Sequence, residues 1–330
     1  MSHYKESHIS RRRFIKLTAG SLAGCYSLTN LYGCTTKEPI VRIASNVWPG
    51  YEFLYLAREK QYFEKHPIKL VELPSATVCI QSVAAGAVEG AMLTLDEVLT
   101  ARAEGLDLRV IAVLDISIGA DVVLAKPNIK TLSDLKGKRI GVEKSAVGAV
   151  MLHAVLNKSG LTISDINPKY MTVSTHKEAY LNNEVDALIT FEPVKTQLEE
   201  KGAINLFDSS QISGRIVDVL AVHPSVIKNS PNTIKKIIQS HFMARDYYVK
   251  NQTKASAILA QRMHISPSQV PGSYDGLSLP DIDQNRHYLD GNNPALQTTA
   301  IELTEIMYQA GLLETKMVPH DLIDSSLLPQ

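Results

Sequence analysis

The chain has 330 residues, 45% of them hydrophobic, and its 34 basic and 34 acidic residues give no formal net charge. This length allows two domains or lobes, and the balanced charge excludes a protein that holds nucleic acid through a strongly basic face. The sequence has no low-complexity tract, heptad run or short internal repeat, which indicates a globular body.

The N-terminal segment matches the twin-arginine export pattern. Arg11 and Arg12 lie in the run SRRRFIK, before an uncharged stretch that is too short and too polar for a spanning helix. Such signals are addresses read by a receptor and do not anchor a chain. A frayed basic helix on a cytosolic protein is the alternative interpretation. We expect residues 1–33 to form a signal peptide; they carry five basic residues and one acidic residue, so the remainder holds 29 basic and 33 acidic residues.

Two cysteines near this signal indicate that the exported chain is lipidated. The runs LAGC, ending at Cys25, and LYGC, ending at Cys34, both resemble the lipobox of bacterial lipoproteins. Cys25 has the better local match, whereas Cys34 leaves a more suitable apolar length and precedes a polar tether, 34–39. We favour Cys34 as the lipidated residue, with Cys25 as the alternative. Cys79 lies in an apolar context and is interpreted as a buried small hydrophobe, so no disulfide framework or metal site is predicted.

Strands alternate with helices through the first two thirds of the chain, which predicts an α/β protein. A first series has strands at 40–44, 69–73, 91–94 and 108–114 and helices at 53–63, 77–87 and 95–103. A second series has strands at 121–125, 139–142, 169–173, 187–190 and 218–223 and helices at 147–159 and 177–182. From residue 233 onward the chain is largely helical, at 233–250, 254–263, 285–289 and 297–310.

These series predict two lobes with a hinge. Residues 40–120 begin lobe 1, residues 121–224 form lobe 2, and residues 225–330 are a return segment and helical tail that completes lobe 1. The crossings are expected near Gly119 and Ala120, and again between 214 and 231. A crevice between two hinged lobes is a natural ligand site.

Several short motifs carry a family resemblance. They are WPGYE at 48–52 with the preceding Val47, LDE at 95–97, GAD at 119–121, KTLSDLKGKRIGV at 130–142, EVDA at 184–187 and FEP at 191–193. Together they resemble the nitrate/sulfonate/taurine-type substrate-binding proteins of ABC importers, a group that includes binders of thiamine precursors. The resemblance covers about residues 40–315. It implies a periplasmic-binding-protein fold of type II that closes on one small molecule and presents it to a membrane permease.

Candidate ligand-binding residues follow the strands. Trp48 and Tyr51 could enclose an apolar or ring portion of a ligand, with plain core packing as the alternative for Trp48. Ser75 and Ser145 precede helices whose N-terminal N–H groups could meet an anion, and simple N-capping is the alternative for both.

Acidic residues among the candidates argue against an anionic ligand. Asp96 opens a helix, Asp121 lies at the predicted hinge, and Glu192 follows a strand of lobe 2. Several crevice carboxylates would repel a pure anion and favour a positive or hydrogen-bond-donating ligand, and Glu192 is the favoured contact. For Asp96 and Asp121, an N-cap charge and a hinge hydrogen bond are the alternatives.

No other motif predicts chemistry. The histidines lack metal-ligand spacing, and no nucleophile elbow or phosphate loop is present, so we predict no catalytic residues, metal or cofactor. The sequence therefore predicts a monomeric, lipid-anchored periplasmic binding protein. An enzyme on the same fold, of the thiamine-precursor or chorismate type, and a ligand sensor for a membrane receptor are the alternatives.

Overall fold

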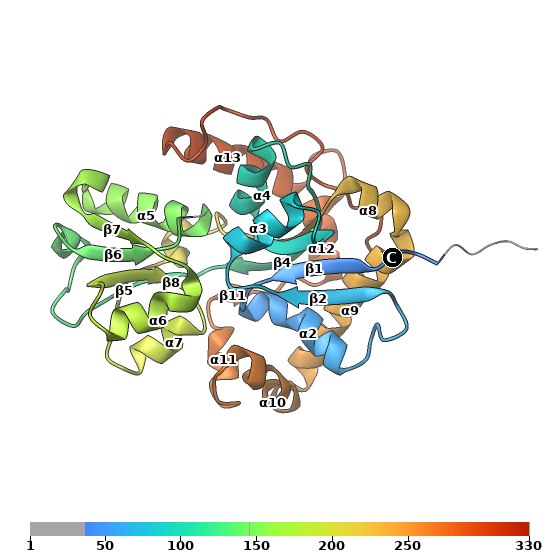
Figure 1. Cartoon of the computed structure of the whole chain (residues 1–330), viewed down its shortest axis with the longest axis horizontal. Helices are drawn as coiled ribbons and strands as arrows, with labels where there is room; N and C mark the ends of the chain where they lie inside the picture. Colours follow the sequence, from blue (N-terminus) through green and yellow to red (C-terminus); the bar gives the residue numbers. More distant parts are fainter. Residues whose placement is uncertain (1–36, 145, 330) are drawn as a thin grey trace, which may run out of the picture. The chain divides into compact units, whose positions relative to one another are not determined.

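The computed structural model describes residues 37–144 and 146–329, which form two α/β lobes, each built on its own sheet (Figure 1). Arg11, Arg12, Cys25, Cys34 and Ser145 lie outside the described residues. Within the described part of the chain, every helix is too short or too polar to cross a bilayer.

The first sheet has six strands in the order β11-β4-β10-β3-β1-β2. These strands are β1 (Val41–Ser45), β2 (Ile68–Glu72), β3 (Gly90–Thr94), β4 (Arg109–Ser117), β10 (Val217–Val222) and β11 (Leu277–Ser278). β1 runs parallel to β2 and β3, whereas β10 runs antiparallel to β3 and β4. The parallel strands read as short apolar runs because helices cover both faces of the sheet.

The second sheet has five strands in the order β7-β6-β8-β5-β9. They are β5 (Val122–Ala125), β6 (Arg139–Val142), β7 (Asn167–Tyr170), β8 (Ala187–Thr190) and β9 (Ile204–Asp208). β6 is parallel to β7 and β8, and β5 is antiparallel to β8 and β9.

The helices alternate with these strands. The first lobe contains η1 (Pro49–Tyr51), α2 (Glu52–Glu59), α3 (Ala76–Ala84) and α4 (Leu95–Ala103). The second contains η2 (Leu132–Leu135), α5 (Ala146–Ser159), η3 (Ile163–Asp165), α6 (Val173–Leu181), α7 (Val194–Glu199) and η4 (Ser209–Ile212). The tail contains α8 (Pro224–Asn229), α9 (Pro231–Lys250), α10 (Gln252–Met263), α11 (Val270–Ser273), α12 (Ile282–Leu289) and α13 (Ala295–Gln309).

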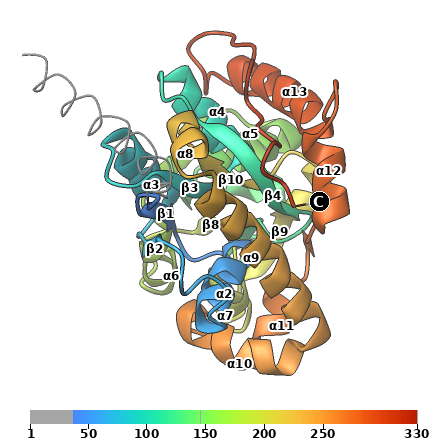
Figure 2. The same ribbon diagram turned by 90° about the vertical axis from the view of Figure 1, so that its right-hand side faces the viewer.

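The helical tail packs on the first lobe, as the sequence predicts. α9 and α10 lie beside α2, while α13 lies beside α4 (Figure 2). The two faces of the six-stranded sheet therefore have separate cores, one shared with α12 and α13 and the other with α9. Asn285 fixes α12 to the sheet, since its Oδ1 accepts from Val113 N at 2.7 Å and its Nδ2 donates to Val113 O at 2.9 Å.

Strand β10 differs from its predicted place. Its sequence position assigns it to the second series, but it lies in the six-stranded sheet, between β3 and β4. All six of its residues are buried, so their pattern fits the middle of either sheet and does not reveal the pairing. Strand β9 and helix α7 were not predicted at all.

Two linkers join the lobes, one between β4 and β5 and one between η4 and β10. Ser209 connects them, because its Oγ accepts from Gly119 N and lies 2.7 Å from Ser117 Oγ. The tail also reaches this point, where Ile118 N donates to Gly276 O at 2.7 Å. A Cβ on Gly276 would lie 2.8 Å from the carbonyl carbon of Gly119, so only glycine fits this backbone crossing.

Candidate ligand cavity between the lobes

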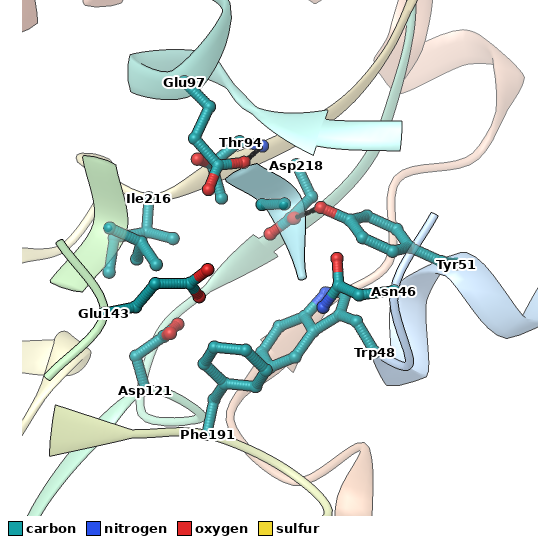
Figure 3. A pocket seen from close by; sticks show the side chains of 12 residues that line it. Asn46, Trp48, Tyr51, Thr94, Glu97, Asp121, Glu143, Phe191, Ile216 and Asp218 are labelled. Carbon is teal, nitrogen blue, oxygen red and sulfur yellow. Dashed lines mark hydrogen bonds between the residues drawn. The ribbon is translucent and has the colours of Figure 1, made fainter. Parts of the chain in front are cut away.

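A small cavity of about 20 Å³ lies where the two sheets face each other (Figure 3). Its walls come from both lobes and consist of Asn46, Trp48, Tyr51, Ala76, Thr94, Glu97, Asp121, Glu143, Val147, Phe191, Ile216 and Asp218. This space is about that of one water molecule, so a larger solute needs the walls of the two lobes to move apart.

Strand direction explains this position. Parallel strands β1 and β3 of the first sheet, and β6 and β8 of the second, all end at the cavity. Ligands of open α/β sheets bind at the carboxyl ends of strands, where loops carry the side chains. The cavity thus occupies the place that the predicted series of strands implies.

Two aromatic rings meet across the lobes. Trp48, after β1, and Phe191, after β8, lie edge to face with their ring centroids 5.3 Å apart. Trp48 Nε1 donates to both carboxylate oxygens of Asp115, at 3.2 and 3.1 Å. The Asp115 carboxylate in turn fills the space beside Gly50, where a Cβ would lie 1.6 Å from Oδ2. This contact gives the glycine of the WPGYE motif a structural reason.

Carboxylates form another part of the wall. Tyr51 donates its hydroxyl hydrogen to Asp218 Oδ1, and Thr77 Oγ1 donates to Glu143 Oε1 at 3.3 Å. Glu97 Oε2 accepts from the backbone N–H of Thr94 at 2.9 Å. Asp121 Oδ2 and Asp218 Oδ2 are buried without a hydrogen-bond partner among the described residues.

Burial dominates the protonation of these groups. It raises the pKa of Asp121 to about 7, with the charge of Asp96 adding to this rise. Burial also raises the pKa of Asp115 to about 7. It raises the pKa of Asp218 well above its usual range, and the charge of Asp115, which lies opposite on β4, adds to this rise. Burial likewise raises the pKa of Glu97 well above its usual range. The carboxyls of the cavity wall therefore keep protons closer to neutral pH than exposed carboxyls do.

Replacing Asp121 with asparagine should remove a pH-dependent cost of folding. An unfolded aspartate has a pKa of about 3.9, so between that pH and about 7 the folded chain keeps a proton that the unfolded chain loses. This cost in folding free energy is absent when the pH is below the pKa of the unfolded chain, and it reaches its full value when the pH is above the pKa of the folded chain. The free energy of unfolding of the wild type, minus that of Asp121→Asn, should therefore fall by about 2 kcal/mol between pH 5.5 and 8.

Urea unfolding at the two pH values measures this difference. Glu143 and His176 face Asp121 across an adjoining space, and Lys195 favours its charged form. Burial lowers the pKa of His176 to about 4 and that of His241 to about 3. These shifts reduce stability below pH 6.5 equally in the wild type and in Asp121→Asn, so they cancel in the difference between the two free energies of unfolding. Asp283→Asn, at a side chain that is 83% exposed, is the control. A difference that stays constant with pH contradicts the prediction.

The predicted site residues fall into three groups. Trp48, Tyr51 and Asp121 line the cavity together. Ser75 is buried as the N-cap of α3, its Oγ accepting from Val78 N, and Asp96 is buried behind the lining. Glu192 opens on a neighbouring groove that shares Phe191, where its carboxylate accepts from Thr196 N and Oγ1 at 3.2 and 3.1 Å.

Three lining carboxylates were missed. Asp218 lies in a fully buried strand, and a carboxylate inside such an apolar run is the signal that could have found it. Glu97 completes a capping box, which gives it an ordinary structural explanation. Glu143 is the first polar residue after β6, at the carboxyl end where ligand contacts are expected.

Comparisons with known proteins agree with this fold. The model of the family described as NMT1/THI5 like matches residues 48–255, more than half of the chain. The chain therefore belongs to the NMT1/THI5-like family, and its two-lobe α/β architecture is that of the periplasmic binding proteins of type II.

Individual relatives are distant. A putative aliphatic sulfonates-binding protein of Escherichia coli K12 is 27% identical over 272 residues, which cover 80% of this chain and 83% of the relative. A putative thiamine biosynthesis protein of Haemophilus influenzae is 30% identical over 166 residues, covering 48% and 52%. The alkanesulfonate-binding protein SsuA of Xanthomonas axonopodis pv. citri, bound to MOPS, superposes with a TM-score of 0.76 at 20% identity, covering 87% of this chain and 99% of that one.

Proposed function

We propose that this protein is a solute-binding protein that captures one small molecule between its lobes and delivers it to an ABC-type permease. The observation that carries this proposal is the contact of Trp48 from one lobe with Phe191 from the other across the cavity. A ligand held there touches both lobes at once, so its binding favours the closed arrangement. Names of relatives that bind sulfonates support the same class of function.

The N-terminal sequence supports a site of action outside the cytoplasm. We propose export through the twin-arginine signal at Arg11 and Arg12, followed by lipid attachment at Cys34, or at Cys25. An acyl anchor would keep the lobes near a membrane permease. The mildly acidic remainder of the chain is compatible with this location.

Trp48 provides a direct test, because it is the only tryptophan in the 330 residues. Adding candidate solutes to the purified chain should change its fluorescence emission in a saturable way, since every such change arises in the cavity wall. A bound solute should also raise the melting temperature, because binding at a hundredfold excess over Kd adds about 2.7 kcal/mol to the free energy of unfolding.

Phe191→Ala serves as the specific variant and Tyr170→Ala as its control. Phe191 meets Trp48 in the cavity, whereas Tyr170 is 56% exposed on the second lobe. We expect Phe191→Ala to weaken solute binding and Tyr170→Ala to leave it unchanged. Conversion of a solute into a product by the purified chain would overturn the proposal in favour of an enzyme.

A further inference from the structure

All the charged side chains among the described lining residues of the cavity are acidic. Glu97, Asp121, Glu143 and Asp218 enter it from four different elements, and none of its described lining residues is basic (Figure 3). Lys195, whose charge reaches Asp121, lies outside this lining, with its Nζ 3.7 Å from Glu192 Oε1 and 3.5 Å from Gly119 O. Like charges brought together in a buried space repel each other unless a proton or a cation neutralises them.

The hydrogen-bond donors of the aromatic wall are already used. Trp48 Nε1 donates to Asp115, and the Tyr51 hydroxyl donates to Asp218. The N–H of Thr94, at the start of α4, donates to Glu97. An anion needs donors of these kinds, and the side-chain donors that remain in the lining are the Thr94 hydroxyl and the Asn46 amide, whose Nδ2 lies 3.3 Å from Val47 O. The carboxylate oxygens of the four acidic residues outnumber them as acceptors.

Asp121 has a free acceptor inside the cavity. Its side chain is 4% exposed, and its Oδ2 has no hydrogen-bond partner among the described residues. Figure 3 shows the carboxylate directed inward, on the same side as Glu143. A buried acceptor without a partner is costly, and a ligand N–H would remove that cost.

The rest of the lining favours an organic ligand over a metal ion. No group of three or more His, Cys, Asp or Glu residues within 37–144 and 146–329 is placed to hold a metal. Trp48 and Phe191 present ring surfaces, and Val147 and Ile216 add apolar surface. Aromatic rings attract organic cations through their electron-rich faces.

We propose that the cavity selects an organic cation, such as an amine, an amidine or a protonated heterocycle, whose positive group lies among the four carboxylates and whose apolar part lies against Trp48 and Phe191. This inference rests on the solute-binding function proposed above and names the class of solute. Asp121 supplies the acceptor that the ligand N–H completes. We expect the same carboxyls, once ionised, to disfavour sulfonates and nitrate.

Matched pairs of solutes test the inference on the purified full chain at pH 8. Benzylamine, benzamidine and alkylamines of four to eight carbons are compared with phenylmethanesulfonate, alkanesulfonates and nitrate, and with the neutral benzyl alcohol. We expect saturable changes in Trp48 fluorescence and a rise in melting temperature with cations only. Asp121→Asn should weaken binding of the best cation at least about tenfold, while Asp283→Asn leaves it unchanged.

The outcomes separate this inference from the proposed function. Binding of sulfonates or nitrate, or equal binding of charged and neutral partners, overturns cation selection and leaves solute capture intact. A response to divalent metal ions that EDTA reverses also overturns it. A panel in which no solute of any charge changes Trp48 fluorescence or the melting temperature overturns both. Unchanged cation affinity in Asp121→Asn, with the variant folded by circular dichroism, overturns the role of Asp121.

Discussion

Replacing Arg262 with methionine is expected to lower the free energy of unfolding by about 3–5 kcal/mol at pH 9, where Glu52 is ionised. Arg262 lies on α10, and its Nη1 is 2.6 Å from Oε1 of Glu52, which is fully buried at the start of α2. Its guanidinium carbon also lies 3.5 Å from the centre of the Tyr55 ring. The substitution would leave the Glu52 carboxylate buried without its countercharge, and the tail would lose this attachment to the first lobe.

The effect should depend on pH. Burial raises the pKa of Glu52 to about 8, and the charge of Arg262 opposes that rise. Because the pKa is about 8 even beside Arg262, the carboxyl is largely protonated at pH 6 with or without Arg262. The loss should therefore be larger at pH 9, where the wild type holds the charged ion pair, than at pH 6. The double variant Arg262→Met/Glu52→Gln should recover much of the stability at pH 9.

Urea unfolding measures these changes, and Arg58→Met is the matched control. Arg58 also lies over the Tyr55 ring, at 5.1 Å, but its side chain is 50% exposed and its ion pair with Glu59 is on the surface. Exposed pairs contribute about 0–1 kcal/mol. Equal losses for Arg262→Met and Arg58→Met would show that the buried ion pair has no special role.

Replacing Phe53 with alanine is also expected to lower the free energy of unfolding by about 3–5 kcal/mol. Phe53 is fully buried on α2 between rings supplied by the tail, with centroid distances of 5.4 Å to Tyr274, 5.6 Å to Tyr248 and 5.8 Å to His241. Truncation would open a cavity among these rings, and the packing of α9, which carries Tyr248 and His241, would fill it only in part.

Chemical unfolding with circular dichroism as the probe tests this prediction. Phe53→Leu, which keeps most of the volume, should cost less than about 1.5 kcal/mol. A similar loss for leucine and alanine would mean that ring contacts, and not cavity formation, set the effect. A small loss for both would mean that the tail contributes little to the stability of the first lobe.

Much of the fold could be predicted because it depends on local patterns. The strand Arg139–Val142 and the helix Leu95–Ala103 have the bounds that the sequence predicts, since apolar spacing and end signals determine both. The place of β10 could not be predicted, because strand pairing between distant segments leaves no mark in a uniformly apolar run. Strand β9, Ile204–Asp208, pairs only with β5 at the edge of its sheet, and its mixed burial gives a weak pattern.

The residues of the candidate site also divide into those that a local rule predicts and those that only the tertiary structure brings together. Trp48 and Tyr51 follow a strand, where a positional rule finds them. Glu97 and Asp218 belong to the cavity only because α4 and β10 come together in space. Glu192 occupies a position of the same kind as Trp48, but the turn that follows it directs the carboxylate to Thr196. Which side chains converge is therefore a property of tertiary structure.

The crossing of Gly119 and Gly276 has a consequence for how fast a solute leaves. Two backbones meet there with no side chain between them, so the dihedral angles of the linker can change without any rotamer having to change first. In the solute-binding function proposed above, the lobes would separate by backbone rotation at this joint. The contacts around a bound molecule, together with the hydrogen bonds from Ile118 to Gly276 and from Gly119 to Ser209, would then set how long that molecule is kept.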